Sequence, residues 1–118
     1  MNLATIFDRE DYVRSYPAKS VLFAEGEPGR EMYVVLEGEV EIEIGGRVVE
    51  TVRRGGIVGE MALIDDSPRS ATAVTGTDCR VAAIDERQFT YLVQQTPSFS
   101  LTVMAEMAKR LRRRSHHD

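Results

Sequence analysis

One stretch of this chain indicates both its fold and its candidate function, namely Gly59-Glu60-Met61-Ala62-Leu63-Ile64-Asp65-Asp66-Ser67-Pro68-Arg69-Ser70-Ala71-Thr72. Its first residue is a glycine, which lets the backbone approach a bound molecule closely. The run after Glu60 is long enough for one or two helical turns, and Pro68 ends that helix because its ring bars the residue before it from the α region. Arg69 then opens an alternating segment that is typical of a strand. A short helix followed by a strand that begins with a guanidinium group is suited to binding an anion.

The segments around this stretch predict an antiparallel β-structure. Val40, Ile42 and Ile44 alternate with glutamates, which indicates a strand with one buried face. Gly45-Gly46 is typical of a two-residue hairpin turn. Strands and turns recur about every 8 to 12 residues, which is typical of a sandwich or barrel. We therefore expect a mainly β fold, an antiparallel β-roll of about eight strands over residues 11–85, with a short helix inside residues 59–72.

Helices are expected at both ends of the β-roll. Apolar residues at helical spacing predict a short N-terminal helix within residues 1–10. Asp85 is a candidate N-cap for one C-terminal helix, and Pro97 is the expected first residue of a second. Apolar residues then recur with a helical period as far as Leu111. Two helices over residues 86–115 would complete a single domain of residues 1–118.

The composition limits the class of protein. The 118 residues are 42% hydrophobic and 29% charged, which suits one domain with its own core. The net charge of -4 argues against a surface that clamps nucleic acid. The single cysteine, Cys79, can form no internal disulfide, which indicates a reducing compartment such as the cytoplasm. No apolar run approaches the roughly 20 residues of a membrane span, and the N-terminus does not have the pattern of a signal peptide.

Residues suited to catalysis or metal binding are scarce. The two histidines, His116 and His117, lie at the C-terminus and not on strands, where a metal-binding β-barrel would need them. Glycine-rich phosphate loops of the common kinds are missing. Cys79 has no core histidine to activate it, and the neighbouring side chains Asp65 and Asp66 point apart. We expect no metal, no cofactor and no enzymatic activity.

Both halves of the opening stretch, Gly59–Ile64 and Pro68–Thr72, closely resemble the phosphate-binding cassette of cyclic nucleotide-binding domains. This family includes domains of catabolite activator protein, the protein kinase A regulatory subunit and cyclic-nucleotide-gated channels. Val21–Gly29 and Met32–Val40 look like early strands and turns of the family, so the resemblance covers nearly the whole chain.

The resemblance implies a role for each matching position. Arg69 would hold the exocyclic oxygens of a cyclic phosphate, since a planar fork matches two oxygens at once. Backbone N–H groups of Ala62 and Ala71 and the hydroxyl of Ser70 would complete the cradle. Glu60 would accept a hydrogen bond from the ribose 2′-hydroxyl. The expected ligand-binding residues are Gly59, Glu60, Met61, Ala62, Arg69, Ser70, Ala71 and Arg110.

The resemblance favours cAMP as the ligand, because Ser70 follows the cassette arginine where family members that favour cGMP often carry threonine; cGMP stays open. Apolar walls for the base are expected at Val49, Met61 and Ala73. The last helix would act as a lid, with Arg110 beside the ribose and Ser115 near the adenine amine. Movement of this helix would transmit binding to a second copy of the chain or to an effector protein. We expect no nucleic-acid-binding domain in this chain.

Three alternatives stay open. Arg69 and Glu60 could form an ion pair that only steadies the β-roll. Arg110 and the basic run 112–114 could be a solvated helix end. The chain could be an interaction or dimerisation domain that keeps the β-roll and no longer senses a nucleotide.

Overall fold

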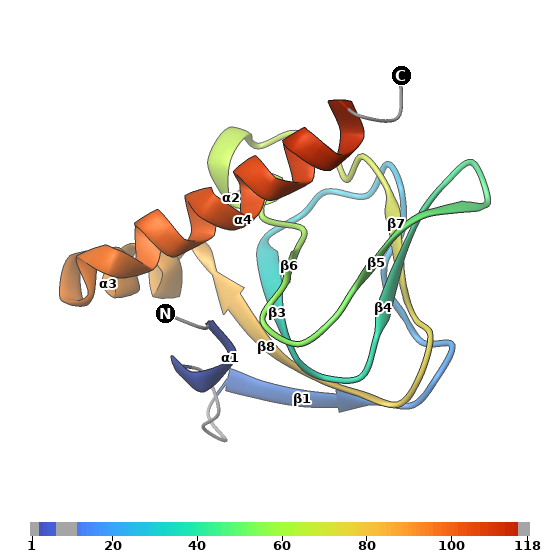
Figure 1. Cartoon of the computed structure of the whole chain (residues 1–118), viewed down its shortest axis with the longest axis horizontal. Coiled ribbons are helices and arrows are strands. Elements are labelled where there is room, and N and C mark those ends of the chain that lie inside the picture. The colour runs from blue at the N-terminus through green and yellow to red at the C-terminus, as the bar shows by residue number, and fades with distance from the viewer. Residues whose placement is uncertain (1–2, 7–11, 116–118) are drawn as a thin grey trace.

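The computed structural model describes residues 3–6 and 12–115, and two four-stranded antiparallel sheets form its centre (Figure 1). One sheet has the strand order β1-β8-β3-β6, and the other has the order β2-β7-β4-β5. The strands are β1 (Val13–Tyr16), β2 (Val21–Phe23), β3 (Glu31–Glu37), β4 (Val40–Ile44), β5 (Arg47–Val52), β6 (Ile57–Val58), β7 (Thr72–Thr75) and β8 (Cys79–Asp85). Most consecutive strands belong to different sheets, so the chain crosses repeatedly from one sheet to the other. This is the β-roll that the alternation predicts.

Strand β3 is buried on both faces, and this explains its continuous apolar sequence. Met32, Val34 and Leu36 face one cluster, which they share with residues of the terminal helices. Tyr33 and Val35 face a second cluster between the two sheets. Successive side chains of a strand point to opposite faces, so a strand between two cores cannot show the polar alternation of a half-exposed strand.

The hairpin between β4 and β5 fixes which side chains face the inside of the β-roll. Val40 pairs with Val52 and Ile42 pairs with Glu50, and the turn lies at Gly45-Gly46 as expected. Val40, Ile42 and Val52 are buried in the cluster between the sheets. Paired residues of antiparallel strands share a face, so Glu50 also points inward.

The helices cover one end and one face of the β-roll. They are α1 (Leu3–Ile6), α2 (Met61–Asp65), α3 (Glu86–Gln95) and α4 (Pro97–Ser115). A capping box starts α3, where Asp85 accepts from the Gln88 N–H and the Gln88 side chain accepts from the Asp85 N–H. Phe99 and Val103 of α4 are buried in the cluster that also contains the outer side chains of β3, and Phe99 meets Phe89 edge to face at 5.4 Å between ring centroids.

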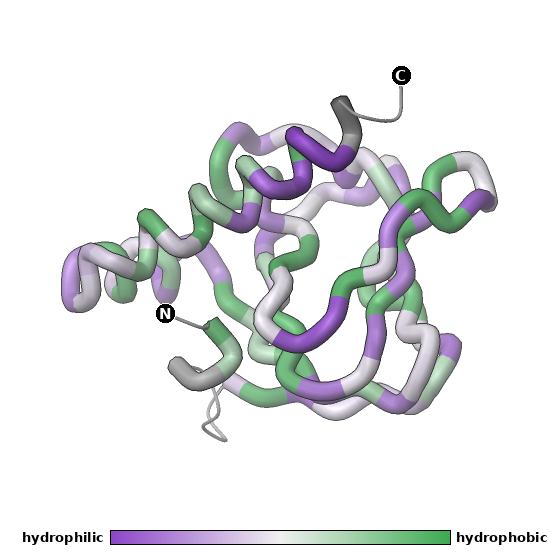
Figure 2. The backbone as a smooth tube through the Cα atoms, viewed as in Figure 1, coloured by the Kyte–Doolittle hydropathy of each residue, from purple (hydrophilic) through white to green (hydrophobic). Residues whose placement is uncertain are grey.

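The second half of α4 extends across the roll (Figure 1), and its Arg110 reaches Glu60, which comes directly before α2. Its last described turns are hydrophilic, in contrast to the hydrophobic stretches of the strands (Figure 2). The mainly β architecture with eight strands, a short cassette helix and flanking helices confirms the predicted fold class. Within the described residues, no helix is long and apolar enough to span a membrane.

Candidate functional site

A cavity of about 240 Å³ lies between the end of β6, helix α2, the start of β7 and the second half of α4. It brings together every residue that the sequence singles out as ligand-binding. These lining residues are Gly59, Glu60, Met61, Ala62, Arg69, Ser70, Ala71 and Arg110. The cavity also has walls that the sequence reasoning missed, namely Phe23, Ile42, Glu50 and Val58.

Arg69 is held in place by backbone carbonyls and an aromatic ring. Its Nη1 donates to the Gly59 carbonyl at 2.9 Å, and its Nη2 donates to the Glu31 carbonyl at 2.7 Å. The guanidinium carbon lies 4.0 Å from the centroid of the Phe23 ring, in cation–π contact. Only 7% of the residue is exposed, and its Nε is a buried donor without an acceptor in the described part of the chain.

Two glycines make room for this guanidinium group. Gly59 has a φ of +76°, and a Cβ there would lie 2.4 Å from Nη1 of Arg69. A Cβ on Gly29 would lie 2.5 Å from Nε of Arg69 and 2.6 Å from the Cβ of Ala62. The role of Gly29 was not predicted, because it depends on a contact across the fold with a residue 40 positions later in the sequence.

Arg69 is a buried cation without a carboxylate partner among the described residues. Burial lowers its pKa, and the negative charge of surrounding groups, Glu31 among them, only partly opposes this effect. Buried charges in proteins are normally paired, because removing an ion from water is costly. The arrangement is therefore suited to an anion that enters the cavity.

Glu60 follows β6 and comes directly before α2, and its carboxylate pairs with Arg110 and not with Arg69. Oε1 accepts from Nη1 of Arg110 at 2.6 Å, and only 5% of the Glu60 side chain is exposed. The alternative in which Arg69 and Glu60 form an ion pair that steadies the roll is therefore wrong. The two residues reach the same cavity with separate partners.

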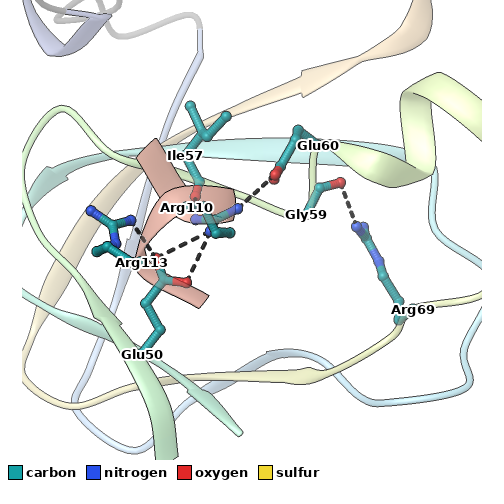
Figure 3. A network of polar contacts seen from close by, with 7 residues as sticks. All are labelled: Glu50, Ile57, Gly59, Glu60, Arg69, Arg110 and Arg113. Carbon is teal, nitrogen blue, oxygen red and sulfur yellow. Dashed lines mark hydrogen bonds and ion pairs between the residues drawn. The ribbon is translucent and has the colours of Figure 1, made fainter. Parts of the chain in front are cut away.

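Arg110 connects α4 to the roll (Figure 3). Its Nε donates to both oxygens of Glu50, at 2.9 and 3.1 Å, and its Nη2 donates to the Ile57 carbonyl at 2.6 Å. Burial by itself lowers the pKa of Arg110, and the carboxylates of Glu60 and Glu50 outweigh this and raise it. Arg110 is thus no solvated helix end. Arg113 is more than half exposed and also reaches Glu50, at 3.2 Å.

The expected apolar walls are only partly right. Met61 lines the cavity, but Val49 and Ala73 are not among its lining residues. Val49 is half exposed, because the strand register turns its neighbour Glu50 toward the inside. Counting in steps of two from the apolar Val52 would have placed Glu50 on the inner face. The side chain of Ser115 and residues His116 and His117 lie outside the described residues.

Ser70 and Cys79 lie in different surroundings. Ser70 is exposed at the rim of the cavity. The Cys79 thiol is buried and donates to the carbonyls of Glu39 and Thr77. Across the described residues, no group of three or more His, Cys, Asp or Glu side chains is arranged to hold a metal ion.

Comparison with known proteins identifies the class to which this fold and cavity belong. The model of the cyclic nucleotide-binding domain family matches residues 13–96. The chain therefore belongs to the cyclic nucleotide-binding domain family, as the motif resemblance predicts.

Individual relatives agree with this assignment. The chain is 39% identical over 92 residues to the cAMP-dependent protein kinase regulatory subunit of Aspergillus niger, covering 76% of this chain and 22% of that protein. It is 30% identical over 106 residues to the cAMP-activated global transcriptional regulator CRP of Escherichia coli O6:H1, covering 85% of this chain and 50% of the relative. The crystal structure of the Thermus thermophilus catabolite activator protein superposes with a TM-score of 0.79 at 29% identity, over 98% of this chain and 55% of that one. The chain thus spans about half or less of the length of these relatives.

Proposed function

We propose that this domain captures cAMP in the cavity beside α4 and acts as a regulatory module. The observation that carries the proposal is Arg69, a buried cation with no carboxylate partner in the described structure and with an Nε donor that has no acceptor. A cyclic phosphate would supply the missing negative charge, and its two exocyclic oxygens fit the planar donors of a guanidinium group. The backbone N–H groups of Ala62 and Ala71 and the hydroxyl of Ser70 would hold the same phosphate.

Glu60 is the proposed reader of the sugar. One of its oxygens is bound by Arg110, and among the described residues no donor reaches the other oxygen, Oε2. A ribose 2′-hydroxyl would donate to Oε2 while the phosphate occupies Arg69. A buried carboxylate whose donor is missing costs on the order of 1–3 kcal/mol, so the site should discriminate against nucleotides that lack this hydroxyl.

Two observations favour cAMP over cGMP. The relatives in Aspergillus niger and Escherichia coli are described as cAMP-dependent and cAMP-activated, and we extend that ligand to this chain. Ser70 follows Arg69 where family members that favour cGMP often have threonine. Phe23, Ile42, Val58 and Met61 supply apolar surface in the cavity that suits a purine base.

Helix α4 is the proposed output. The cavity of about 240 Å³ is slightly smaller than the roughly 300–1,000 Å³ of typical ligand sites, so a nucleotide that enters it would favour an outward shift of the surrounding elements. The residue that closes the cavity from α4 is Arg110, which joins Glu60 and Glu50. A ligand that engages Glu60 would change this contact, and an equilibrium shifts only through contacts that differ between the two states.

The module has no catalytic role in this proposal, and the free, buried Cys79 suits the cytoplasm.

A thermal-shift experiment tests the proposal with cAMP, cGMP and 5′-AMP in parallel. A ligand at 100 times its Kd stabilises the native state by about 2.7 kcal/mol, which for a domain of this size raises Tm by roughly 10 °C. We expect the largest shift with cAMP, a smaller one with cGMP and almost none with 5′-AMP, whose opened phosphate cannot meet Arg69 and Glu60 together. Equal shifts with cAMP and 5′-AMP would contradict the proposal.

A second candidate function is supported by the outer face of α4. Leu101, Met104 and Leu111 are 65%, 53% and 67% exposed, and their spacing places them along one side of the helix. A second copy of the chain or an effector protein could cover this side, either together with nucleotide sensing or in its place. Sedimentation of the protein with and without cAMP tests this candidate, because a monomer under both conditions would exclude self-association.

A further inference from the structure

Two carboxylates that line the cavity, the buried Glu60 and the partly buried Glu50, share the guanidinium group of Arg110 (Figure 3). The side chains of Glu50, Glu60 and Arg110 are only 13%, 5% and 16% exposed. They come from three separate elements, since Glu50 is on β5, Glu60 precedes α2 and Arg110 is on α4. Charges in a shared, poorly solvated network have large mutual effects. The way in which Arg110 divides its donors between the two carboxylates therefore determines which carboxylate oxygens are left to bind a ligand.

The division is unequal. Nε of Arg110 is committed to Glu50 and lies within 3.1 Å of both of its oxygens. Nη2 is committed to the Ile57 carbonyl. Glu60 therefore receives a single hydrogen bond, from Nη1 to Oε1, and its Oε2 has no donor among the described residues.

This single contact differs from the bidentate pair with two parallel hydrogen bonds that an arginine and a carboxylate frequently form. A bidentate pair would occupy both oxygens of Glu60 and leave less acceptor capacity for a ligand. Glu50 opposes such a pair because it holds the Nε edge of the guanidinium group. Arg113 donates to Oε2 of Glu50 at 3.2 Å and places a second positive charge next to this carboxylate.

We propose that Glu50 is a positioning residue, which holds Arg110 so that Oε2 of Glu60 stays open for a ligand hydroxyl. The inference rests on the proposed function, because it takes a ribose 2′-hydroxyl as the donor to Glu60. Glu50 acts only through Arg110. Without Glu50, the guanidinium group turns toward Glu60 and binds both of its oxygens. Glu60 then binds the ribose 2′-hydroxyl less tightly.

The test is the ratio of the Kd for 2′-deoxy-cAMP to the Kd for cAMP, measured by calorimetry. A hydrogen bond to a charged group corresponds to about 10- to 150-fold in affinity, and we expect a ratio in that range for the unmodified chain. Glu50→Ala should bring the ratio down to about threefold or less, mainly through weaker binding of cAMP. Glu50→Gln keeps an acceptor for Nε and should retain most of the discrimination.

Glu39→Ala is the matched control, since it also removes a glutamate paired with an arginine, Arg53, but outside the cavity. Its ratio should equal that of the unmodified chain. An unchanged ratio in a folded Glu50→Ala variant would overturn the inference.

A second measurement separates this inference from the proposed function, because it needs no nucleotide. The Arg110 Nε–H resonance of the ligand-free chain should be protected from solvent exchange in the unmodified protein and in Glu50→Gln, and should lose protection in Glu50→Ala. If no nucleotide binds, the proposed function fails, and this resonance still decides whether Glu50 holds Arg110. Equal exchange in all three proteins would overturn the positioning role.

Discussion

Replacement of Arg69 should abolish tight binding of cAMP without unfolding the domain. In the ligand-free structure Arg69 donates two hydrogen bonds to carbonyls, at 2.9 and 2.7 Å, and stacks on Phe23. Against these contacts stands the cost of a buried cation whose charge no carboxylate of the described structure neutralises. The two contributions oppose each other, so we expect Arg69→Ala to change the free energy of unfolding by less than about 2 kcal/mol.

The effect on binding should be much larger. Truncating one partner of a buried, hydrogen-bonded charge pair costs about 2–5 kcal/mol, which corresponds to about a 30- to 5,000-fold rise in Kd. Arg69→Lys keeps a positive charge but loses the planar fork. If it forfeits one charge-assisted hydrogen bond of about 1.5–3 kcal/mol, the Kd rises about 10- to 150-fold. The order of affinities should therefore be arginine, lysine, alanine.

Competition against a fluorescent cAMP analogue gives these affinities, and circular dichroism confirms folding of each variant. Arg80→Ala is a suitable control, because Arg80 pairs with the exposed Glu37 and does not line the cavity. A folded Arg69→Ala variant that binds cAMP within about threefold of the unmodified chain would refute the role assigned to Arg69.

Three further predictions concern other parts of the molecule. Gly29→Ala adds a Cβ that would lie 2.5 Å from Nε of Arg69. The variant should therefore bind cAMP more weakly and have a lower Tm, and an unchanged affinity would contradict the close packing. Burial and the negative charge of Glu31 raise the pKa of Tyr33 to about 12, so absorbance at 295 nm should show one tyrosine that ionises near pH 12 and is missing in Tyr33→Phe. Since the unfolded tyrosine ionises near pH 10, the stabilising effect of this shift is present below pH 10 and is lost as the pH rises through 12. Replacing Leu101, Met104 and Leu111 together by glutamine should leave cAMP affinity unchanged and should make any self-association disappear in sedimentation, whereas a variant that still self-associates would exclude this side of α4 as the contact.

Much of the fold could be predicted from the sequence because local patterns and tertiary structure agree. The alternation in β4, the glycine turn before β5 and the Asp85 cap of α3 all have local physical causes. The cassette residues were also identifiable, since both halves of the motif lie close together in sequence.

The rest depended on contacts between distant segments. Glu50 sits between two valines and threonine in a strand whose inward face depends on the register with β4. Its role appears only when α4 brings Arg110 and Arg113 to it, 60 and 63 residues later. The prediction of Val49 as a wall failed for the same reason, because a shift of one residue turns a side chain to the other face of a sheet.

We propose that Arg69 and Glu60 together bind a cyclic nucleotide. Calorimetric titration of cAMP into the ligand-free chain tests it most directly. We expect a saturable isotherm with one cAMP per chain, and an affinity that is strongly lowered in Arg69→Ala and lowered in Glu60→Gln. A folded, unmodified chain that gives no binding heat with cAMP or cGMP, and no thermal shift with either, would contradict it.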